Sequence, residues 1–295
     1  MGFCFAQSGV VNVSIFLAAF GLPITAVEVD PWTLLASGET RWTAPASFTN
    51  DDTNQQRTIA THEQMGEVRF IYRPHIAVRV GIGLGVEHGD YVDDDTHTNV
   101  RAAWLRVPAA MMFSQHWGVS TLTSFGSATA NDVPVTDDHR WTMQAGPVWV
   151  RDKSLIIGFF VNYATRIGRR ASIFPFPSVE WDISSAWHLT VVDELDGISR
   201  LTWQVEPRFA IGVRADVRLR EYRLADDQER SLDDDQATLA LETTWCPHGD
   251  NKLRLTLFTG ASLLRQLTYR TDGEVVTSET AGPAFQAGLQ AHSEF

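Results

Sequence analysis

The most distinctive chemical feature of this chain is a series of charged side chains placed at every second position. In the segment Phe209–Arg220, Arg214, Asp216, Arg218 and Arg220 alternate with other, mostly apolar residues. Successive side chains of a β-strand point to opposite faces, so residues two positions apart share a face. The pattern therefore predicts a strand with one charged and one apolar face. Charges along the wall of a pore select ions, whereas paired charges inside a closed wall neutralise one another.

The same alternation occurs in Ile76–Glu87, and it assigns further charges to the interior of a barrel. We predict nine charged residues in this lumen: Arg79, Glu87, Arg200, Arg214, Asp216, Arg218, Arg220, Glu242 and Arg254. With hairpins centred near residues 208 and 248, Arg200 is expected opposite Asp216, and Glu242 opposite Arg254. Two interpretations stay open, namely an arginine ladder that favours anions and a closed lumen in which the charges balance.

The nine histidines of the chain do not form an arrangement that supports catalysis. His188 is expected to face the lumen from a strand. His292 and Ser293 point to opposite faces, so they do not act together as base and nucleophile. The sequence has no metal-ligand spacing, phosphate-binding loop or Gly-x-Ser-x-Gly motif. We predict no enzyme activity, no catalytic residue, no metal site and no cofactor.

Acidic residues cluster in the polar stretches between the alternating segments. These clusters are Asp93–Asp95, Asp137–Asp138, Asp226–Asp227 and Asp233–Asp235. None has the ligand spacing of a calcium-binding loop. We expect them to form a solvated outer face.

The elements that position these charges are predicted to be membrane-spanning strands. Alternating segments of about ten residues, longer than the strands of most soluble sheets, are typical of transmembrane β-barrels. Short turns and longer polar loops follow one another along the chain, as they do in such barrels. The fold class is therefore all-β, with a single transmembrane up-and-down antiparallel β-barrel of about 14 strands. Because the segment Trp187–Val192 is short, 12 strands remain an alternative.

Aromatic residues support this prediction through their position near the short turns. Amphipathic rings favour the membrane–water interface, whereas the core of a β-sandwich would place them in mid-strand. The predicted periplasmic girdle consists of Tyr72, Phe113, Trp117, Trp149, Trp181, Trp187, Phe209, Trp245 and Phe295.

The start of the chain has the only long continuous apolar segment, Gly9–Ala26. It resembles the apolar part of a signal peptide, although no Lys or Arg precedes it; a single membrane anchor is the alternative. We predict a signal peptide at residues 1–26, a lead-in segment at 27–38 and the barrel at 39–295.

The last residues, 284–295, are predicted to form the strand that closes the barrel. Phe285 and Leu289 would face lipid, whereas Gln286, Gln290 and His292 would face the interior. Pairing with the first strand would leave no unsatisfied edge in the membrane. The final Phe295 resembles the terminal aromatic that marks outer-membrane barrels for assembly, so the barrel assembly machinery is an expected partner.

Three segments of the second half carry a resemblance to a known family. They are Phe174–Val191, Arg214–Leu224 and Thr256–Arg270. In them the chain resembles a family of uncharacterised Gram-negative outer-membrane β-barrel proteins. The resemblance implies a barrel in the Gram-negative outer membrane and brings no activity or catalytic residue.

Composition restricts the possible partners. The net charge of −12 and the pI of about 5.1 argue against a nucleic-acid partner, because phosphate binding needs clustered Lys and Arg. Expected partners are outer-membrane lipids and lipopolysaccharide. The leading hypothesis is a passive pore for small solutes or ions with a charged lumen. The alternatives are a non-conducting structural or adhesive barrel and a secreted or periplasmic β-sandwich binding protein.

Overall fold

The computed structural model describes residues 31–75, 77–93, 97–131, 139–152, 154–167, 169–191, 197–224, 230–247 and 252–295. The predicted signal peptide, residues 1–26, and the first residues of the predicted lead-in segment lie outside these ranges. All regular elements of the described residues are strands. Within these ranges no helix is long and apolar enough to cross a membrane.

The strands follow one another along the chain in a single meander. β1 begins at Trp32, inside the segment 27–38 that was expected to precede the barrel. The strands are β1 (Trp32–Asn50), β2 (Gln56–His75), β3 (Val78–Val92), β4 (His97–Met112), β5 (Trp117–Ala130), β6 (Arg140–Asp152), β7 (Leu155–Arg166), β8 (Arg169–Asp182), β9 (Trp187–Val191), β10 (Ile198–Glu206), β11 (Phe209–Arg223), β12 (Arg230–Trp245), β13 (Leu253–Thr271), β14 (Glu274–Ala281) and β15 (Ala284–Glu294).

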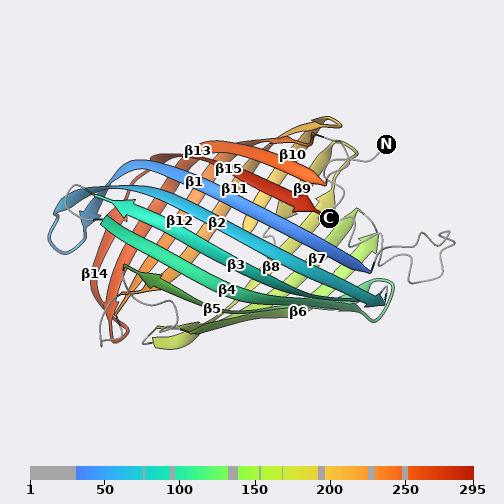
Figure 1. Ribbon diagram of the computed structural model, residues 1–295, viewed down its shortest axis with the longest axis horizontal. Coiled ribbons are helices and arrows are strands. Elements are labelled where there is room, and N and C mark those ends of the chain that lie inside the picture. Colours follow the sequence, from blue (N-terminus) through green and yellow to red (C-terminus); the bar gives the residue numbers. More distant parts are fainter. Residues whose placement is uncertain are drawn as a thin grey trace.

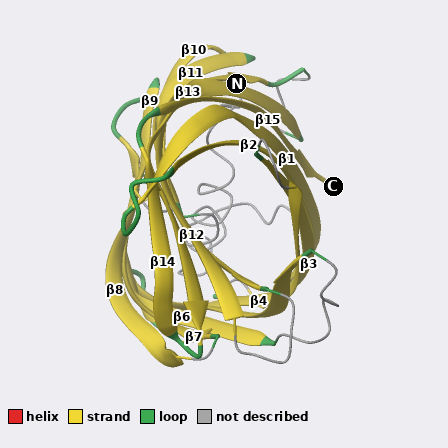
Figure 2. Cartoon of the chain, turned by 90° about the vertical axis from the view of Figure 1, so that its left-hand side faces the viewer, coloured by secondary structure: helices red, strands yellow, loops and turns green. Residues whose placement is uncertain are grey.

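The sheet closes on itself through its last strand, which is interrupted at Gly282 and Pro283. β14 and β15 are the two halves of this strand, because both pair with β13 on one side and with β1 on the other. The register places Ser37 opposite His292. The fold is therefore a closed antiparallel barrel of 14 strands (Figures 1 and 2). The prediction of about 14 strands is confirmed, and both the 12-stranded alternative and the β-sandwich are wrong.

The two ends of the barrel differ in their connections. We call the end with the β2–β3, β4–β5, β6–β7, β8–β9, β10–β11 and β12–β13 connections the turn end, and the opposite one the loop end. Both the start of β1 and Phe295 lie at the turn end, where Leu34 and Phe295 exchange two backbone hydrogen bonds of 3.1 and 2.9 Å. In Figure 1 the loop end is on the left.

The outer surface of the barrel is apolar because the alternating residues point outward. On β3, Ile82, Leu84 and Val86 are exposed, Leu84 to 65%. Their inward neighbours are glycines, and a Cβ at Gly85 would overlap the indole of Trp104 on β4. Large side chains on the outside and small ones inside reverse the order of a soluble domain, as a lipid-facing wall requires.

The interior at the loop end is filled by apolar side chains, which the sequence analysis did not predict. This loop-end core consists of Ala46, Phe48, Ile59, Tyr91, Val100, Ala128, Ala130, Tyr222, Leu232, Leu267, Ala281 and Ala284. Here β5 and β11 meet across the interior, with Thr129 paired to Arg223 in a parallel bridge. Part of the barrel is thus closed at this end by packed side chains.

The two faces of the closing strand can be tested with neighbouring residues. Gly288 points inward, and a larger side chain there would overlap the Phe258 ring and the Thr40 carbonyl, whereas Ala287 is on the opposite face. We expect Gly288→Leu to destabilise the barrel by about 1–3 kcal/mol or to prevent refolding, because the site is already filled. Heat-modifiable migration in detergent measures the folded fraction. Ala287→Leu should fold normally, and equal loss in both variants would contradict the face assignment.

Candidate functional site

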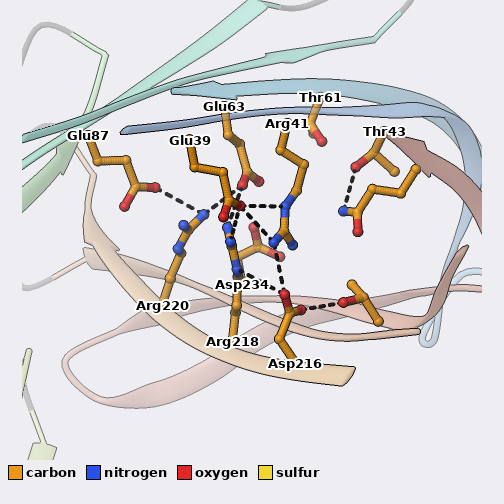
Figure 3. A network of polar contacts seen from close by, with 12 residues as sticks. Glu39, Arg41, Thr43, Thr61, Glu63, Glu87, Asp216, Arg218, Arg220 and Asp234 are labelled. Carbon is orange, nitrogen blue, oxygen red and sulfur yellow. Dashed lines mark hydrogen bonds and ion pairs between the residues drawn. The ribbon is translucent and has the colours of Figure 1, made fainter. Parts of the chain in front are cut away.

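A cluster of ion pairs crosses the interior between two groups of strands (Figure 3). β1, β2 and β3 supply one side of it, and β11, β12 and β13 the other. We call it the central network and define it by five arginines and five carboxylates: Arg41, Arg214, Arg218, Arg220, Arg265, Glu39, Glu63, Glu87, Asp216 and Asp234. With all ten side chains ionised, its formal charge is zero.

Two arginines form the most buried part of this network. Arg41 is 2.9 Å from both Glu39 and Asp216, and Arg214 is 3.1 and 3.0 Å from the same two carboxylates. Both arginine side chains are only 1% exposed. The Phe258 ring lies beneath both guanidinium groups, at 5.4 and 4.5 Å from its centre. This ring supplies a cation–π contact where water is excluded.

The remaining arginines link this part to β2, β3 and β12. Arg218 bridges Glu39 and Glu63 at 2.7 and 3.1 Å, and Arg220 bridges Glu63 and Glu87 at 3.0 and 2.9 Å. Arg265 donates two hydrogen bonds to Asp234, of 2.8 and 2.6 Å. Each arginine therefore serves as a fixed cross-link between walls of the barrel, because a planar guanidinium holds carboxylates in defined directions.

The structure places the nine predicted lumen charges in four environments. Glu87, Arg214, Asp216, Arg218 and Arg220 belong to the central network. Arg200 and Glu242 pair with each other at 3.3 Å, and Arg200 also donates to Gln290 on the closing strand at 3.0 Å. Arg79 lines a small interior pocket of about 90 Å³ with Met112 and Glu180. Arg254 pairs in register with His292.

Both predicted hairpin registers are wrong. Arg200 lies opposite Arg214, and Glu242 lies opposite Phe258. An irregularity between Gln204 and Glu206 shifts the first hairpin. The second hairpin has a longer connection than expected, from β12 ending at Trp245 to β13 starting at Leu253. A shift by an even number of residues leaves each side chain on its predicted face of the strand. The cross-strand partners therefore change, but the inward or outward direction of each side chain does not.

One acidic cluster is not a solvated loop, contrary to the prediction. β12 begins at Arg230, so Asp233–Asp235 are strand residues. Asp233 and Asp234 are buried and pair with Arg270 and Arg265 at 2.9 and 2.6 Å. Asp93 pairs with Arg57 at 3.3 Å. Residues 94–95, 137–138 and 226–227 lie outside the described residues.

The nine predicted girdle aromatics all lie within three residues of a strand end at the turn end of the barrel. Trp117 pairs in register with Trp149, and Phe209 with Trp245. Trp187 stacks on a further residue, Trp203, with ring centres 6.0 Å apart. Trp32, another residue that the sequence analysis left out, stacks on Tyr72 at 4.0 Å. Trp32 and Trp203 both occupy alternating positions that point outward, as the predicted aromatics do. This alternation was the feature of the sequence that could have identified them.

A cavity of about 410 Å³ lies beside the central network, toward β4–β8. Trp104, Phe174 and Tyr222 give it aromatic surface, and Asn162 and Gln290 add neutral polar groups. Arginines outnumber carboxylates in its lining, which includes Arg106, Arg140, Arg166, Arg218 and Arg220 against Glu39, Glu87 and Glu221. The cavity is thus amphipathic, with an excess of positive charge.

The three arginines on this side of the cavity have carboxylate partners at different distances. Arg140 and Arg166 share one carboxylate, that of Glu221, at 3.6 and 3.8 Å. Arg106 has a closer partner in Glu67 at 2.7 Å and lies over the Trp104 ring at 5.1 Å. The ion pairs of Arg140 and Arg166 with Glu221 are therefore longer than that of Arg106 with Glu67.

His188 lies between Asp182 and Thr190, at 2.7 and 3.1 Å from their side-chain oxygens. This row of carboxylate, imidazole and hydroxyl resembles a catalytic triad in order. However, Asp182 and His188 are partners in the β8–β9 register, and Thr190 is the next residue on the same face. Strand pairing alone accounts for these contacts, and we assign no catalytic role to them.

Comparison with known proteins identifies the fold. No protein-family model matches the chain, and no curated protein matches its sequence. Among solved structures, an outer-membrane channel from Pseudomonas putida F1 is similar at 9% identity, with a TM-score of 0.50, over 92% of this chain and 97% of that chain. The P. putida toluene transporter TodX is similar at 7% identity and a TM-score of 0.45, over 97% and 94% of the two chains. The likeness concerns the fold of outer-membrane β-barrels alone.

The central network allows a direct test of buried charge. Asp216→Asn removes the carboxylate that Arg41 and Arg214 share. We expect the free energy of unfolding to fall by about 3–5 kcal/mol, because the buried network then carries one positive charge that no carboxylate balances. Urea-induced unfolding of the refolded barrel measures this change. The control Glu274→Gln removes an exposed carboxylate on β14 and should change stability by less than about 0.5 kcal/mol. Similar small effects in both variants would show that Asp216 is not the centre of the network.

Proposed function

We propose that this protein is an outer-membrane channel for small solutes, with a lumen that favours anions. The observation that carries the proposal is the amphipathic cavity beside the central network, whose lining has more arginines than carboxylates. The channel is narrow, because the network and the loop-end core occupy much of the interior.

The outer surface supports a position in a membrane. On the outward face of β1, Trp32 and Trp42 are exposed and ten residues apart. At a rise of about 3.3 Å per residue and a tilt of about 40°, this separation spans about 25 Å, the height of the apolar band of such barrels. The predicted girdle then marks the periplasmic interface. Outer-membrane lipid and lipopolysaccharide surround the wall, and the barrel assembly machinery recognises the C-terminal strand that ends at Phe295.

The conducting path follows from the division of charges. The paired charges of the central network act as a fixed partition, since they are buried and balanced. Solutes pass on the other side of this partition, past Arg106, Arg140 and Arg166 on β4, β6 and β7. Rings or rows of positive side chains at a constriction select anions.

A second candidate function is a non-conducting barrel that serves envelope structure or adhesion. The loop-end core favours it, because Val100 and Ala130 are fully buried where β5 and β11 meet. In this case the interior charges only stabilise the fold.

Cell fractionation tests the membrane assignment. We expect the protein in the outer-membrane fraction and heat-modifiable migration in detergent, because a closed barrel with an apolar exterior resists unfolding by detergent alone. A protein found in the aqueous fraction after osmotic shock would rule out the membrane location.

Planar-bilayer recordings separate the two candidate functions. We expect small single-channel conductance with anion preference, and a fall in the anion-to-cation permeability ratio by about a factor of two or more in Arg140→Glu. Arg101→Glu is the control, because Arg101 is exposed on the face of β4 opposite Arg106. No conductance from folded protein would favour the structural role. Conductance without an effect of Arg140→Glu would overturn the anion path.

A further inference from the structure

A groove of about 890 Å³ lies on the outer surface of the barrel, where β15, β1, β2, β3, β4 and β5 follow one another (Figure 1). Its floor consists of small outward residues, namely Ala36, Gly38, Gly66, Ala103 and Ala291. Larger apolar side chains border this floor, namely Val68, Leu84, Val86, Leu105 and Phe125. The register joins three floor residues, because Gly38 lies opposite both Ala291 and Gly66. We call this feature the wall groove.

Packing within the protein does not account for the glycines of this floor. Beyond its chain neighbours, a Cβ at Gly38 would come no closer than 3.6 Å, to the Met65 carbonyl, and one at Gly66 no closer than 3.9 Å, to that of Ser37. Neither glycine has a positive φ. By contrast, a Cβ at the inward Gly85 would overlap an indole ring. A glycine that weakens a strand without a packing reason marks a place where a ligand approaches the backbone closely.

A row of exposed polar residues borders the wall groove toward the loop end. This polar row consists of Gln64, His88 and Arg101. The register places His88 opposite both Gln64 and Arg101, so the three side chains are neighbours on one face of the sheet. Each lies two positions beyond a residue of the groove on its own strand, namely Gly66, Val86 and Ala103. The polar row thus begins where the apolar groove ends.

The polar row lies at the loop-side border of the apolar band. On β4, Arg101 and Met111 are both exposed on the outward face and ten residues apart. With the rise and tilt used above for Trp32 and Trp42, this separation again spans about 25 Å. Because the turn end faces the periplasm in the proposed orientation, the polar row lies at the level of the headgroups of the outer leaflet.

The charge of the polar row suits an anionic headgroup. Among the described residues, Arg101 has no carboxylate partner. Asp90, on the same face of β3 as His88, lies 3.5 Å from His88 and 3.2 Å from His97. A guanidinium binds phosphate oxygens through two parallel hydrogen bonds, and Gln64 adds a neutral amide for a saccharide.

We propose that the wall groove and the polar row bind one lipopolysaccharide molecule of the outer leaflet. A phosphate of its lipid A part binds Arg101 and His88, and an acyl chain lies in the groove along Gly66 and Gly38. The cationic row favours this occupant over a second copy of the chain, because it calls for an anion at the depth of the headgroups. The site rests on the proposed membrane location; it lies on the lipid-facing side of the wall and takes no part in the path through the interior.

Native mass spectrometry of the refolded full chain in detergent tests this site. The probes are lipid A with two phosphates, the same lipid after removal of both, and phosphatidylglycerol, each titrated to obtain a Kd. Arg101→Gln removes the guanidinium, and Gly66→Leu fills the groove. The matched controls are Arg170→Gln, which removes an exposed arginine at the loop end of β8, and Ala215→Leu, which adds the same bulk to an exposed position of β11. Heat-modifiable migration confirms folding of every variant.

We expect the wild-type protein to bind lipid A with two phosphates about tenfold more tightly than either other probe, because charge-assisted hydrogen bonds are the strong ones. Arg101→Gln should remove most of this preference and leave the Kd of the dephosphorylated lipid unchanged. Gly66→Leu should weaken the binding of both forms of lipid A by about tenfold, because the added side chain occupies the place of the acyl chain. Both controls should behave as the wild type does.

Equal binding of the three probes would overturn the lipopolysaccharide site, and so would unchanged binding in folded Arg101→Gln and Gly66→Leu. A dimer of the lipid-free protein that Gly66→Leu abolishes would assign the groove to a second copy instead. If Gly66→Leu does not fold, the loss of phosphate preference in Arg101→Gln decides.

The channel and the lipid site can fail separately. Preferential binding of phosphorylated lipid A by a folded barrel without chloride conductance would overturn the channel function and leave the lipid site standing. Chloride conductance without preferential binding would overturn the lipid site alone.

Discussion

Closure of the hydrogen-bonded ring between β1 and the divided last strand is the constraint on which the rest of this structure depends. In hydrocarbon, an unpaired backbone N–H or C=O costs several kcal/mol, so a spanning sheet needs a partner for every strand. β1 pairs with both β14 and β15. The pairing continues to the final residue, because Phe295 exchanges backbone hydrogen bonds with Leu34 of β1. Among the described residues, β8 has no partner on its β9 side before Val179, and Pro175 and Pro177 have no N–H group to leave unpaired there.

Closure brings distant segments together, and the central network results from it. Arg41 and Asp216 are 175 positions apart in the chain but form an ion pair of 2.9 Å. Isolated, each of these charges would be costly to bury; arranged as five arginines and five carboxylates, they satisfy one another. The network therefore fixes the distance between two walls of the barrel and leaves the cavity on the side of β4–β8. In the proposed channel, the charges that stabilise the barrel and the charges that select ions are thus different residues of the same interior.

Local pattern was enough to predict the faces of the strands. The outward set that includes Leu84 and Val86, and the inward set that includes Arg214 and Asp216, follow from a period of two, which is a property of a single strand. The same local signal gave the strand number, because short turns and long loops alternate along the sequence. Trp32 was not included in the predicted girdle because the barrel was expected to begin at residue 39, whereas β1 begins at Trp32.

The strand register and the side-chain packing could not be predicted from the local sequence pattern. A bulge or a longer turn moves every partner of a strand, as it does for Arg200 and Glu242, while changing no residue type. Asp233 and Asp234 were predicted to be loop residues because acidic side chains are normally solvated. Arg265 and Arg270 of the neighbouring strand pair with them and help to make their burial favourable. The sequence by itself determined the barrel, its 14 strands and the face of each side chain, since these depend on neighbours along the chain. Tertiary structure alone decided the ion-pair partners and the loop-end core, since these depend on which strands meet when the ring closes.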